Sequence, residues 1–106
     1  MLGYNDTAIN GILENIVFLE LMRRGYLVYI GKTDDYEIDF VARKNDSLLY
    51  IQVSYLLSSP ETYERELRPL KSIKDSYPKL VLSMDNLPQS NQDGIVRMNI
   101  RDWLIQ

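Results

Sequence analysis

Two stretches of alternating apolar and polar residues, joined by a short polar link, constrain the middle of the sequence more than any other feature. They are residues 37–43 (EIDFVAR) and 48–55 (LLYIQVSY), with KNDS between them. Alternation with a period of two is typical of strands that present one face to a core, and a link of this length suits a hairpin. Together with residues 26–30 (YLVYI), these stretches predict an antiparallel meander of three strands.

A long helix is predicted before the meander, over residues 7–24. Asp6 or Thr7 can cap its start, and Gly25 follows its end, where glycine favours the left-handed conformation that closes many helices. Apolar residues recur almost all round this segment. A helix of this kind is usually buried on more than one side, and we expect the same here.

The rest of the chain predicts a crossover helix, further strands and a short last helix. The crossover helix begins at a capping box in residues 58–61 (SSPE) and runs to about residue 77, with a kink at Pro69. A strand at residues 79–84 (KLVLSM) follows, and a strand after a crossover helix usually pairs parallel to its neighbour. Beyond a loop, the final predicted elements are a strand at residues 95–99 and a helix at residues 100–105.

This order of elements predicts the α/β fold class. We expect three layers around a mixed sheet, in the order helix, strand, strand, strand, helix, strand, with a small C-terminal strand and helix. A length of 106 residues suits one domain, residues 1–106. No apolar run approaches the roughly 18 residues that cross a membrane, and the N-terminus lacks the basic start of a signal peptide. We therefore expect a cytoplasmic protein without membrane contact.

The composition excludes several kinds of site. The sequence contains no cysteine and no histidine, which removes disulfide bonds, thiolate metal sites, most zinc sites and the usual general base. A bound metal would therefore be a hard cation with oxygen ligands, such as Mg²⁺. The net charge of −3 has the wrong sign for a free-standing, non-specific DNA-binding protein.

Three polar residues are candidates for a common site. Asp39 lies in the second predicted strand, Gln52 in the third, and Glu14 on a stripe of the first helix that is otherwise apolar. Burying an unpaired carboxylate is costly, so Glu14 needs an explanation. If the first helix packs on the sheet face that shows Asp39 and Gln52, two carboxylates and a carbonyl oxygen converge. This donor set would suit Mg²⁺, completed by water and phosphate.

On these residues the chain resembles the PD-(D/E)xK, or restriction-endonuclease-like, superfamily. The segment LENIVFLELMRRGY is similar to its first-helix signature, Asp39 in EIDF matches the motif aspartate, and Gln52-Val53-Ser54 aligns with the (D/E)xK tripeptide. Within the superfamily, the chain looks most like the C-terminal domain of unknown function in many prokaryotic AAA-type ATPases. The segments YIQVSYLL, ETYERE, IKDSYPKLVLSMD and NQDGI extend this similarity. The resemblance implies a restriction-endonuclease-like fold and the C-terminal fragment of a larger ATPase.

Two residues depart from the pattern of the superfamily. Gln52 replaces a carboxylate and could face a metal only without charge, while Ser54 replaces the lysine that orients the attacking water in active members. Some members move this lysine to the following helix, in which four basic residues are candidates: Arg65, Arg68, Lys71 and Lys74. Helical geometry turns Arg65 towards solvent unless a kink re-aims it, and it places Lys74 too far along the helix.

The resulting hypothesis is a nuclease fold that does not cut. Glu14, Asp39 and Gln52 would be a vestigial catalytic set, with weak or absent metal binding at Asp39 and Glu14 and no cofactor. The domain would dock to the ATPase module of its parent protein and contact a partner protein or, weakly, DNA. An alternative is an active Mg²⁺-dependent endonuclease or resolvase-like phosphodiesterase with a relocated cation. A third interpretation is a structural domain that forms homodimers.

Overall fold

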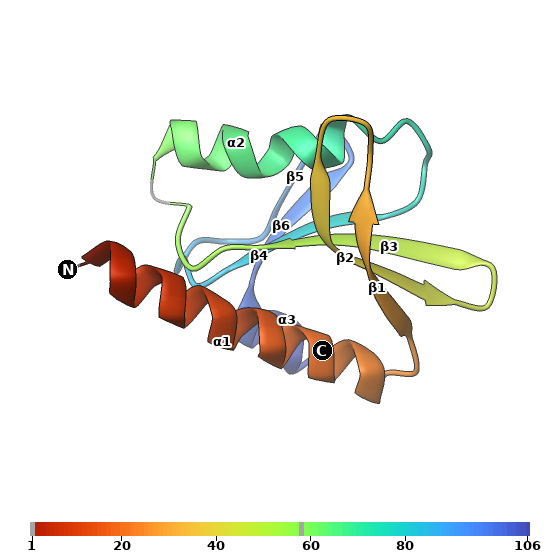
Figure 1. The fold of residues 1–106 in the computed structure, drawn as a ribbon, viewed down its shortest axis with the longest axis horizontal. Helices are drawn as coiled ribbons and strands as arrows, with labels where there is room; N and C mark the ends of the chain where they lie inside the picture. The colour runs from red at the N-terminus through yellow and green to blue at the C-terminus, as the bar shows by residue number, and fades with distance from the viewer. Residues whose placement is uncertain (1, 58) are drawn as a thin grey trace.

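A six-stranded mixed sheet runs through the centre of the structure, a computed structural model that describes residues 2–57 and 59–106 (Figure 1). Its strands are β1 Leu27–Lys32, β2 Glu37–Lys44, β3 Ser47–Val53, β4 Lys79–Ser83, β5 Ser90–Gln92 and β6 Ile95–Asn99. The first three form the predicted antiparallel meander, and β4 pairs parallel to β3 as predicted. β6 pairs parallel to β4, and β5 closes the sheet antiparallel to β6. Across the sheet the order is β1-β2-β3-β4-β6-β5.

Within the described residues, three helices cover the two faces of the sheet: α1 Leu2–Arg23, α2 Pro60–Lys71 and α3 Ile100–Leu104. α1 and α3 lie on one face and α2 lies on the other (Figure 1). This is the predicted arrangement of three α/β layers. None of these helices is both long enough and apolar enough to pass through a lipid bilayer.

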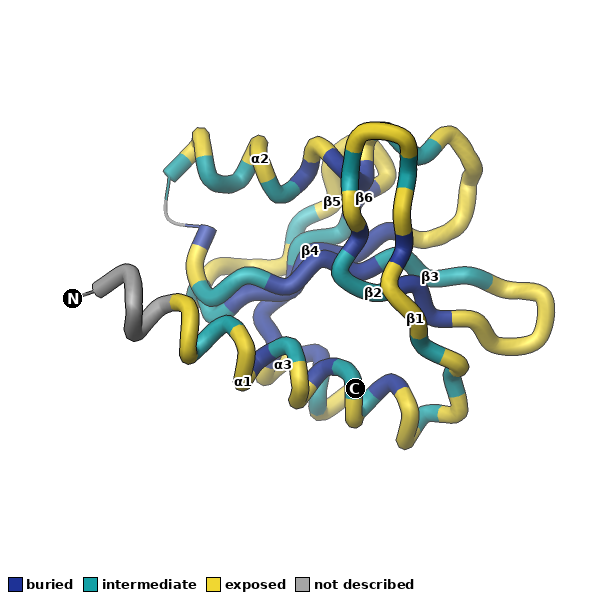
Figure 2. The backbone as a smooth tube through the Cα atoms, in the orientation of Figure 1, coloured by how far each residue is buried: buried dark blue, intermediate teal, exposed yellow. Residues whose placement is uncertain are grey.

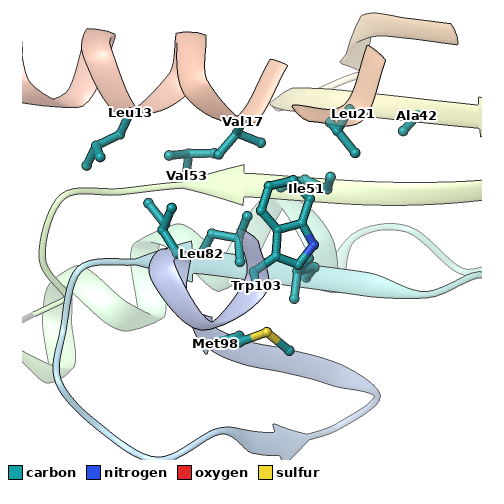
Figure 3. Packing of buried hydrophobic residues seen from close by; sticks show 11 residues of the cluster. Leu13, Val17, Leu21, Ala42, Ile51, Val53, Leu82, Met98 and Trp103 are labelled. Atoms are coloured by element: carbon teal, nitrogen blue, oxygen red, sulfur yellow. The ribbon is translucent and has the colours of Figure 1, made fainter. Parts of the chain in front are cut away.

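The central strand β4 shows how the sheet separates two cores. Leu80 and Leu82 belong to the core under α1 and α3, whereas Val81 belongs to the core under α2. Strands buried on both faces read as continuous apolar runs, and KLVLS fits that description. On the first face, the fully buried Val17 and Leu21 of α1 lie one turn apart and point towards the sheet (Figure 3).

The helix α1 is buried on one side only, which corrects the expectation of burial on more than one side. Figure 2 shows exposed positions recurring along its length. Four of the exposed residues have large apolar side chains: Ile12, Ile16, Leu19 and Met22. The sheet and α3 cover only the opposite side of the helix. α1 also begins at Leu2, before the predicted start at residue 7. Its predicted end is confirmed, because Gly25 follows with a left-handed φ of 93°.

The helix α2 is shorter than predicted and is capped by a different serine. Ser59 accepts a hydrogen bond from the Thr62 N–H (3.1 Å), whereas Ser58 of the predicted capping box lies outside the described residues. The helix ends at Lys71 instead of near residue 77. Pro69 therefore lies buried in the last turn. The helix ends two residues later, so the prediction of a kink within a longer helix was wrong.

Contacts of Lys79 hold the segment that connects α2 to β4. This nearly buried ammonium group donates hydrogen bonds to the backbone carbonyls of Asp75 (2.8 Å) and Tyr77 (2.9 Å) and to the Asp75 carboxylate (3.2 Å). The other carboxylate oxygen of Asp75 accepts a hydrogen bond from the Tyr50 hydroxyl (2.6 Å). The segment before β4 is thus held in a turn by tertiary contacts, which the helical periodicity of the sequence does not reveal.

The strand β5 lies in a segment that was predicted to be a loop. Its residues Ser90–Gln92 are polar and lack the alternation that marks a half-buried strand. Asp93 and Gly94 join it to β6 with positive φ angles of 55° and 78°. An Asp-Gly pair with this geometry is a common two-residue hairpin turn, so the turn was the signal that could have identified this strand.

Candidate functional site

The strand β2 contains a bulge at the candidate aspartate. Tyr29 of β1 faces Val41, but Gly31 faces Ile38, so two steps along β1 correspond to three along β2. The extra residue lies in the segment that contains Asp39. Bulges disrupt the ladder locally and re-aim side chains, and they are frequent beside active sites. This bulge positions Asp39 where β2 stops pairing with β3.

The bulge also explains a glycine in β1. Ile38 and Val41 both belong to the core under α2, although strict alternation would place them on opposite faces. They converge on Gly31, where an added Cβ would lie 2.5 Å from Val41 Cγ2 and 3.0 Å from Ile38 Cβ. A side chain at this position would force Val41 to shift, because real Cβ atoms essentially never come as close as 2.5 Å to another heavy atom.

Asp39 and Gln52 join β2 to β3 beyond the end of their regular ladder. The Asp39 N–H donates to Gln52 Oε1, and Asp39 Oδ2 accepts from the Val53 N–H, both at 2.8 Å. On its other side, Gln52 Nε2 donates to the Glu66 backbone carbonyl in α2 (3.4 Å). The Gln52 side chain, in a residue only 5% exposed, thus connects two strands and a helix.

The three predicted site residues lie around the place where β2 and β3 stop pairing, and not on one face under α1. Gln52 follows the alternation of β3 and extends to α2, because Ile51 and Val53 occupy the opposite face under α1. Glu14 approaches from α1 and lines a small cavity with Asp39. The expectation of one face under the first helix was therefore wrong for Gln52, although the structure does bring Asp39 close to both other residues.

Three carboxylates influence one another here. Burial raises the pKa of Asp39, the hydrogen bond from the Val53 N–H opposes this rise, and the charge of Glu37 adds to it. Burial and the charge of Asp39 raise the pKa of Glu14. Burial, followed by the charge of Asp39, likewise raises the pKa of Glu66, with Arg65 opposing and Glu14 adding. The ionised Asp39 therefore makes both Glu14 and Glu66 harder to ionise.

Glu66 was missed in the sequence, where its segment ETYERELR reads as a solvated helix face. It lies three residues after Tyr63 and four before Leu70, both of which pack in the core under α2. Positions with these spacings share one helix face, so the helical spacing alone could have indicated that Glu66 faces the core. The string of charges in the same segment obscured it.

A cleft of about 640 Å³ opens between α1, the end of β3 and the start of α2. Glu14, Ser54, Arg65 and Glu66 are among its lining residues. Ser54, at the position of the expected lysine, donates its hydroxyl to the Leu56 carbonyl (3.3 Å). Arg65 is exposed, as predicted, and it also lines this cleft, which the helical geometry of the sequence did not indicate.

The donor atoms of this site do not fit a magnesium ion well. Asp39 Oδ2 and Gln52 Oε1 each already accept a backbone N–H, which leaves fewer free lone pairs for a cation. In residues 2–57 and 59–106, no group of three or more Asp, Glu, His or Cys side chains is arranged to hold a metal ion. The geometry is that of a polar structural junction beside an acidic cleft.

The chain is similar to one protein family and to two longer proteins, and the match to the family includes all six strands. A family model described as "Domain of unknown function (DUF4143)" matches residues 10–103. An uncharacterized protein of Haemophilus influenzae is 48% identical over 94 residues, which cover 89% of this chain and 23% of that protein. An uncharacterized protein of Methanocaldococcus jannaschii is 36% identical over 100 residues, which cover 86% of this chain and 21% of that protein. The chain thus spans less than a quarter of the length of these curated relatives.

Proposed function

The chain belongs to the DUF4143 family, and we propose that it is a catalytically degenerate nuclease fold that serves as a docking domain of a AAA-type ATPase. The family is commonly found with AAA ATPases, which supports the choice of partner. The order of helix, antiparallel meander, crossover helix and parallel strand agrees with the restriction-endonuclease-like fold that the sequence resembles. In the parent protein, the domain would bind the ATPase module and present its own surface to a further partner.

The hydrogen bonds of the Gln52 side chain are the observation that carries the proposal. Its carbonyl oxygen accepts the Asp39 N–H and its amide nitrogen donates to the Glu66 carbonyl, so both polar atoms have partners inside the protein. A metal ion at this position would have to compete with these bonds, and it would gain no negative charge from the amide. Oxygen sites for divalent cations depend on ligand charge. Gln52 therefore fits a structural role better than a catalytic one.

The second support is the charge around the cleft. Glu14 and Glu66 line the cleft, the charge of the nearby Asp39 adds to burial in raising the pKa of both, and Ser54 brings no positive charge. A phosphodiester is an anion, so such a cleft repels it unless a cation intervenes. Losing one positioned charge-stabilising or proton-transfer group typically slows catalysis by about 10²–10⁴-fold. Together with the loss of the carboxylate charge at Gln52, the loss of the lysine should leave activity below the limit of ordinary assays.

One observation favours the alternative of an active Mg²⁺-dependent endonuclease. Arg65 lines the same cleft as Glu14, and its charge acts on Glu66. A guanidinium group there could take the place of the missing lysine in stabilising charge on a phosphate. This alternative still requires Asp39 to bind a metal, so substitutions at Asp39 and Arg65 distinguish the two functions.

Plasmid nicking with Mg²⁺ or Mn²⁺ tests the proposal directly. We expect no metal-dependent nicking by the wild-type chain. The double variant Gln52→Glu with Ser54→Lys rebuilds the acidic residue and lysine on β3 and should gain Mg²⁺ binding. Nicking by the wild type that disappears in both Asp39→Ala and Arg65→Ala, but persists in Arg68→Ala, would establish the endonuclease instead. Arg68 is a suitable control because it is also exposed on α2 but does not line the cleft.

Docking needs a separate measurement. The Haemophilus influenzae relative can be produced without the region that matches this chain, and that region can be added back as a separate protein. We expect the two parts to associate in a calorimetric titration. Absence of binding, in a sample where both parts are folded, would contradict the docking function even if no nicking is found.

A further inference from the structure

The outward face of α1 carries a regular apolar stripe. Five exposed residues define it, at successive spacings of four, three, four and three: Ala8, Ile12, Asn15, Leu19 and Met22. The three large side chains are 60%, 56% and 52% exposed, and Ile16 lies beside the stripe. We call this set of five the α1 stripe. It lies opposite the Val17 and Leu21 face that packs on the sheet.

Such a face is unusual on a surface helix. A helix on the outside of a globular protein normally turns charged and polar residues to solvent. The α1 stripe contains no charged residue, and among its members only Asn15 is polar. Contiguous exposed apolar surface of this kind marks a binding site for another protein surface.

The spacing indicates a second helix as the occupant. Apolar residues at alternating intervals of three and four form the seam of a two-helix coiled coil, where each side chain inserts between residues of the facing helix. The stripe follows this pattern over two heptads, from Ala8 to Met22. An extended strand or a small ligand would not require this periodicity.

The chemistry of the stripe indicates that this helix is α1 of another copy. A face without charges is complementary to itself, because two copies bring no like charges together. Asn15 lies at its middle, seven residues from both Ala8 and Met22, and an amide is both donor and acceptor. Two Asn15 side chains near a two-fold axis can therefore pair with each other, and a single polar residue in a coiled-coil seam is a known way to fix register and oligomeric state.

We propose that the α1 stripe is a homodimer interface in which α1 of one copy packs against α1 of another across a two-fold axis. This inference does not depend on the docking or nuclease interpretations, because it uses a face of α1 that points away from the sheet. The dimer explains why α1 has a second apolar side although the fold covers only one side of it.

Molecular mass in solution is the first test, measured by sedimentation equilibrium or light scattering over a range of concentrations. The wild-type chain should have twice the 12.4 kDa mass of one copy at high concentration. Leu19→Glu should weaken association about a hundredfold, because it buries a like charge from each copy in the seam. The matched control is Leu87→Glu, since Leu87 is 51% exposed but lies outside α1.

The absence of cysteine from the sequence permits a second, geometric test. Asn15→Cys should form a disulfide-linked dimer under mild oxidation, because the two copies of this position lie near the axis. Asn86→Cys is the control, with the same starting residue at an exposed position far from α1 in the sequence. A chain that remains monomeric at high concentration would overturn the proposal. So would a dimer that survives Leu19→Glu, or one in which Asn86→Cys crosslinks as readily as Asn15→Cys.

Discussion

At the scale of single residues, the bulge in β2 depends on Gly31. An added Cβ there would lie 2.5 Å from Val41 Cγ2, so Gly31→Ala must displace a buried side chain. We expect this variant to lower the free energy of unfolding by about 1–3 kcal/mol, as overpacking does. Gly11→Ala is the matched control, because nothing lies within 4 Å of its Cβ position and alanine favours a helix interior. It should raise the free energy of unfolding by about 0.5–1 kcal/mol. Urea unfolding measures both, and equal effects would contradict the prediction.

Glu66 and Glu20 should respond to pH in opposite directions. Burial and nearby carboxylates raise the pKa of Glu66 above 4.5, so its stabilising contribution is complete below that pH and is lost as pH rises through the raised pKa. Hydrogen bonds from Arg23 and Arg24 lower the pKa of Glu20 to about 2, so its contribution is present above 4.5 and lost as pH falls towards 2.

Two glutamine substitutions test this difference. At neutral pH, Glu66→Gln should raise the free energy of unfolding and flatten its dependence on pH above 4.5, because a buried charge is removed. Glu20→Gln should lower the free energy of unfolding at the same pH, because an ion pair is lost. Urea unfolding at several pH values measures both. A loss of stability in Glu66→Gln at neutral pH would mean that its carboxylate has a stabilising partner.

The candidate site shows what single residues reveal in a sequence. The pairing of Asp39 with Gln52 could be anticipated, because alternation on two adjacent strands fixes which positions are neighbours. The bulge could not, since it arises from the fit of Gly31 between Ile38 and Val41. Nor could the internal hydrogen bonds of Gln52, because they depend on where the α2 backbone lies.

At the scale of elements, Lys79 holds the segment that connects α2 to β4. Replacing it by methionine keeps the length of the side chain but leaves the carbonyls of Asp75 and Tyr77 without their donor. We expect Lys79→Met to cost about 1–3 kcal/mol of the free energy of unfolding, the usual penalty for unpaired buried polar groups. Hydrogen exchange in residues 72–78 should accelerate as well.

The control for this variant is Lys74→Met, in the same connecting segment but at an exposed position. It should change the free energy of unfolding little, since exposed substitutions rarely exceed about 0.5 kcal/mol. If both variants were equally stable, the contacts of Lys79 would not be what holds this segment in place. The strands of the meander were easier to predict than this helix end, because their alternation records one buried face and needs no distant contact.

At the scale of the whole molecule, the three-layer α/β arrangement followed from the order of helices and strands. A parallel strand after a crossover helix limits the topology strongly, and β4 paired with β3 as that rule requires. What covers the outward side of α1 was not predictable in the same way. Its all-round apolar sequence indicated burial, but one chain cannot show whether the covering layer belongs to the same copy or to another.

Net charge is also a property of the whole molecule, and it predicts the response to nucleic acid. With a net charge of −3 and carboxylates around the cleft, the chain should bind duplex DNA weakly, with a dissociation constant of about 10⁻⁴ M or above. Added salt should abolish what binding there is, because phosphate contacts act by releasing counterions. Fluorescence anisotropy of a labelled duplex at low and physiological salt measures both effects.

Substitutions in α2 show whether the weak binding uses the cleft. Glu66→Gln removes a negative charge from the cleft lining, whereas Glu64→Gln removes one from an exposed residue that pairs with Lys71 and does not line it. If DNA enters the cleft, only Glu66→Gln should tighten binding appreciably, since Coulomb repulsion falls with distance. Equal effects would place the contact elsewhere on the surface. Tight binding by the wild type at physiological salt would contradict the prediction from net charge, because it would require a basic surface strong enough to outweigh the acidic cleft.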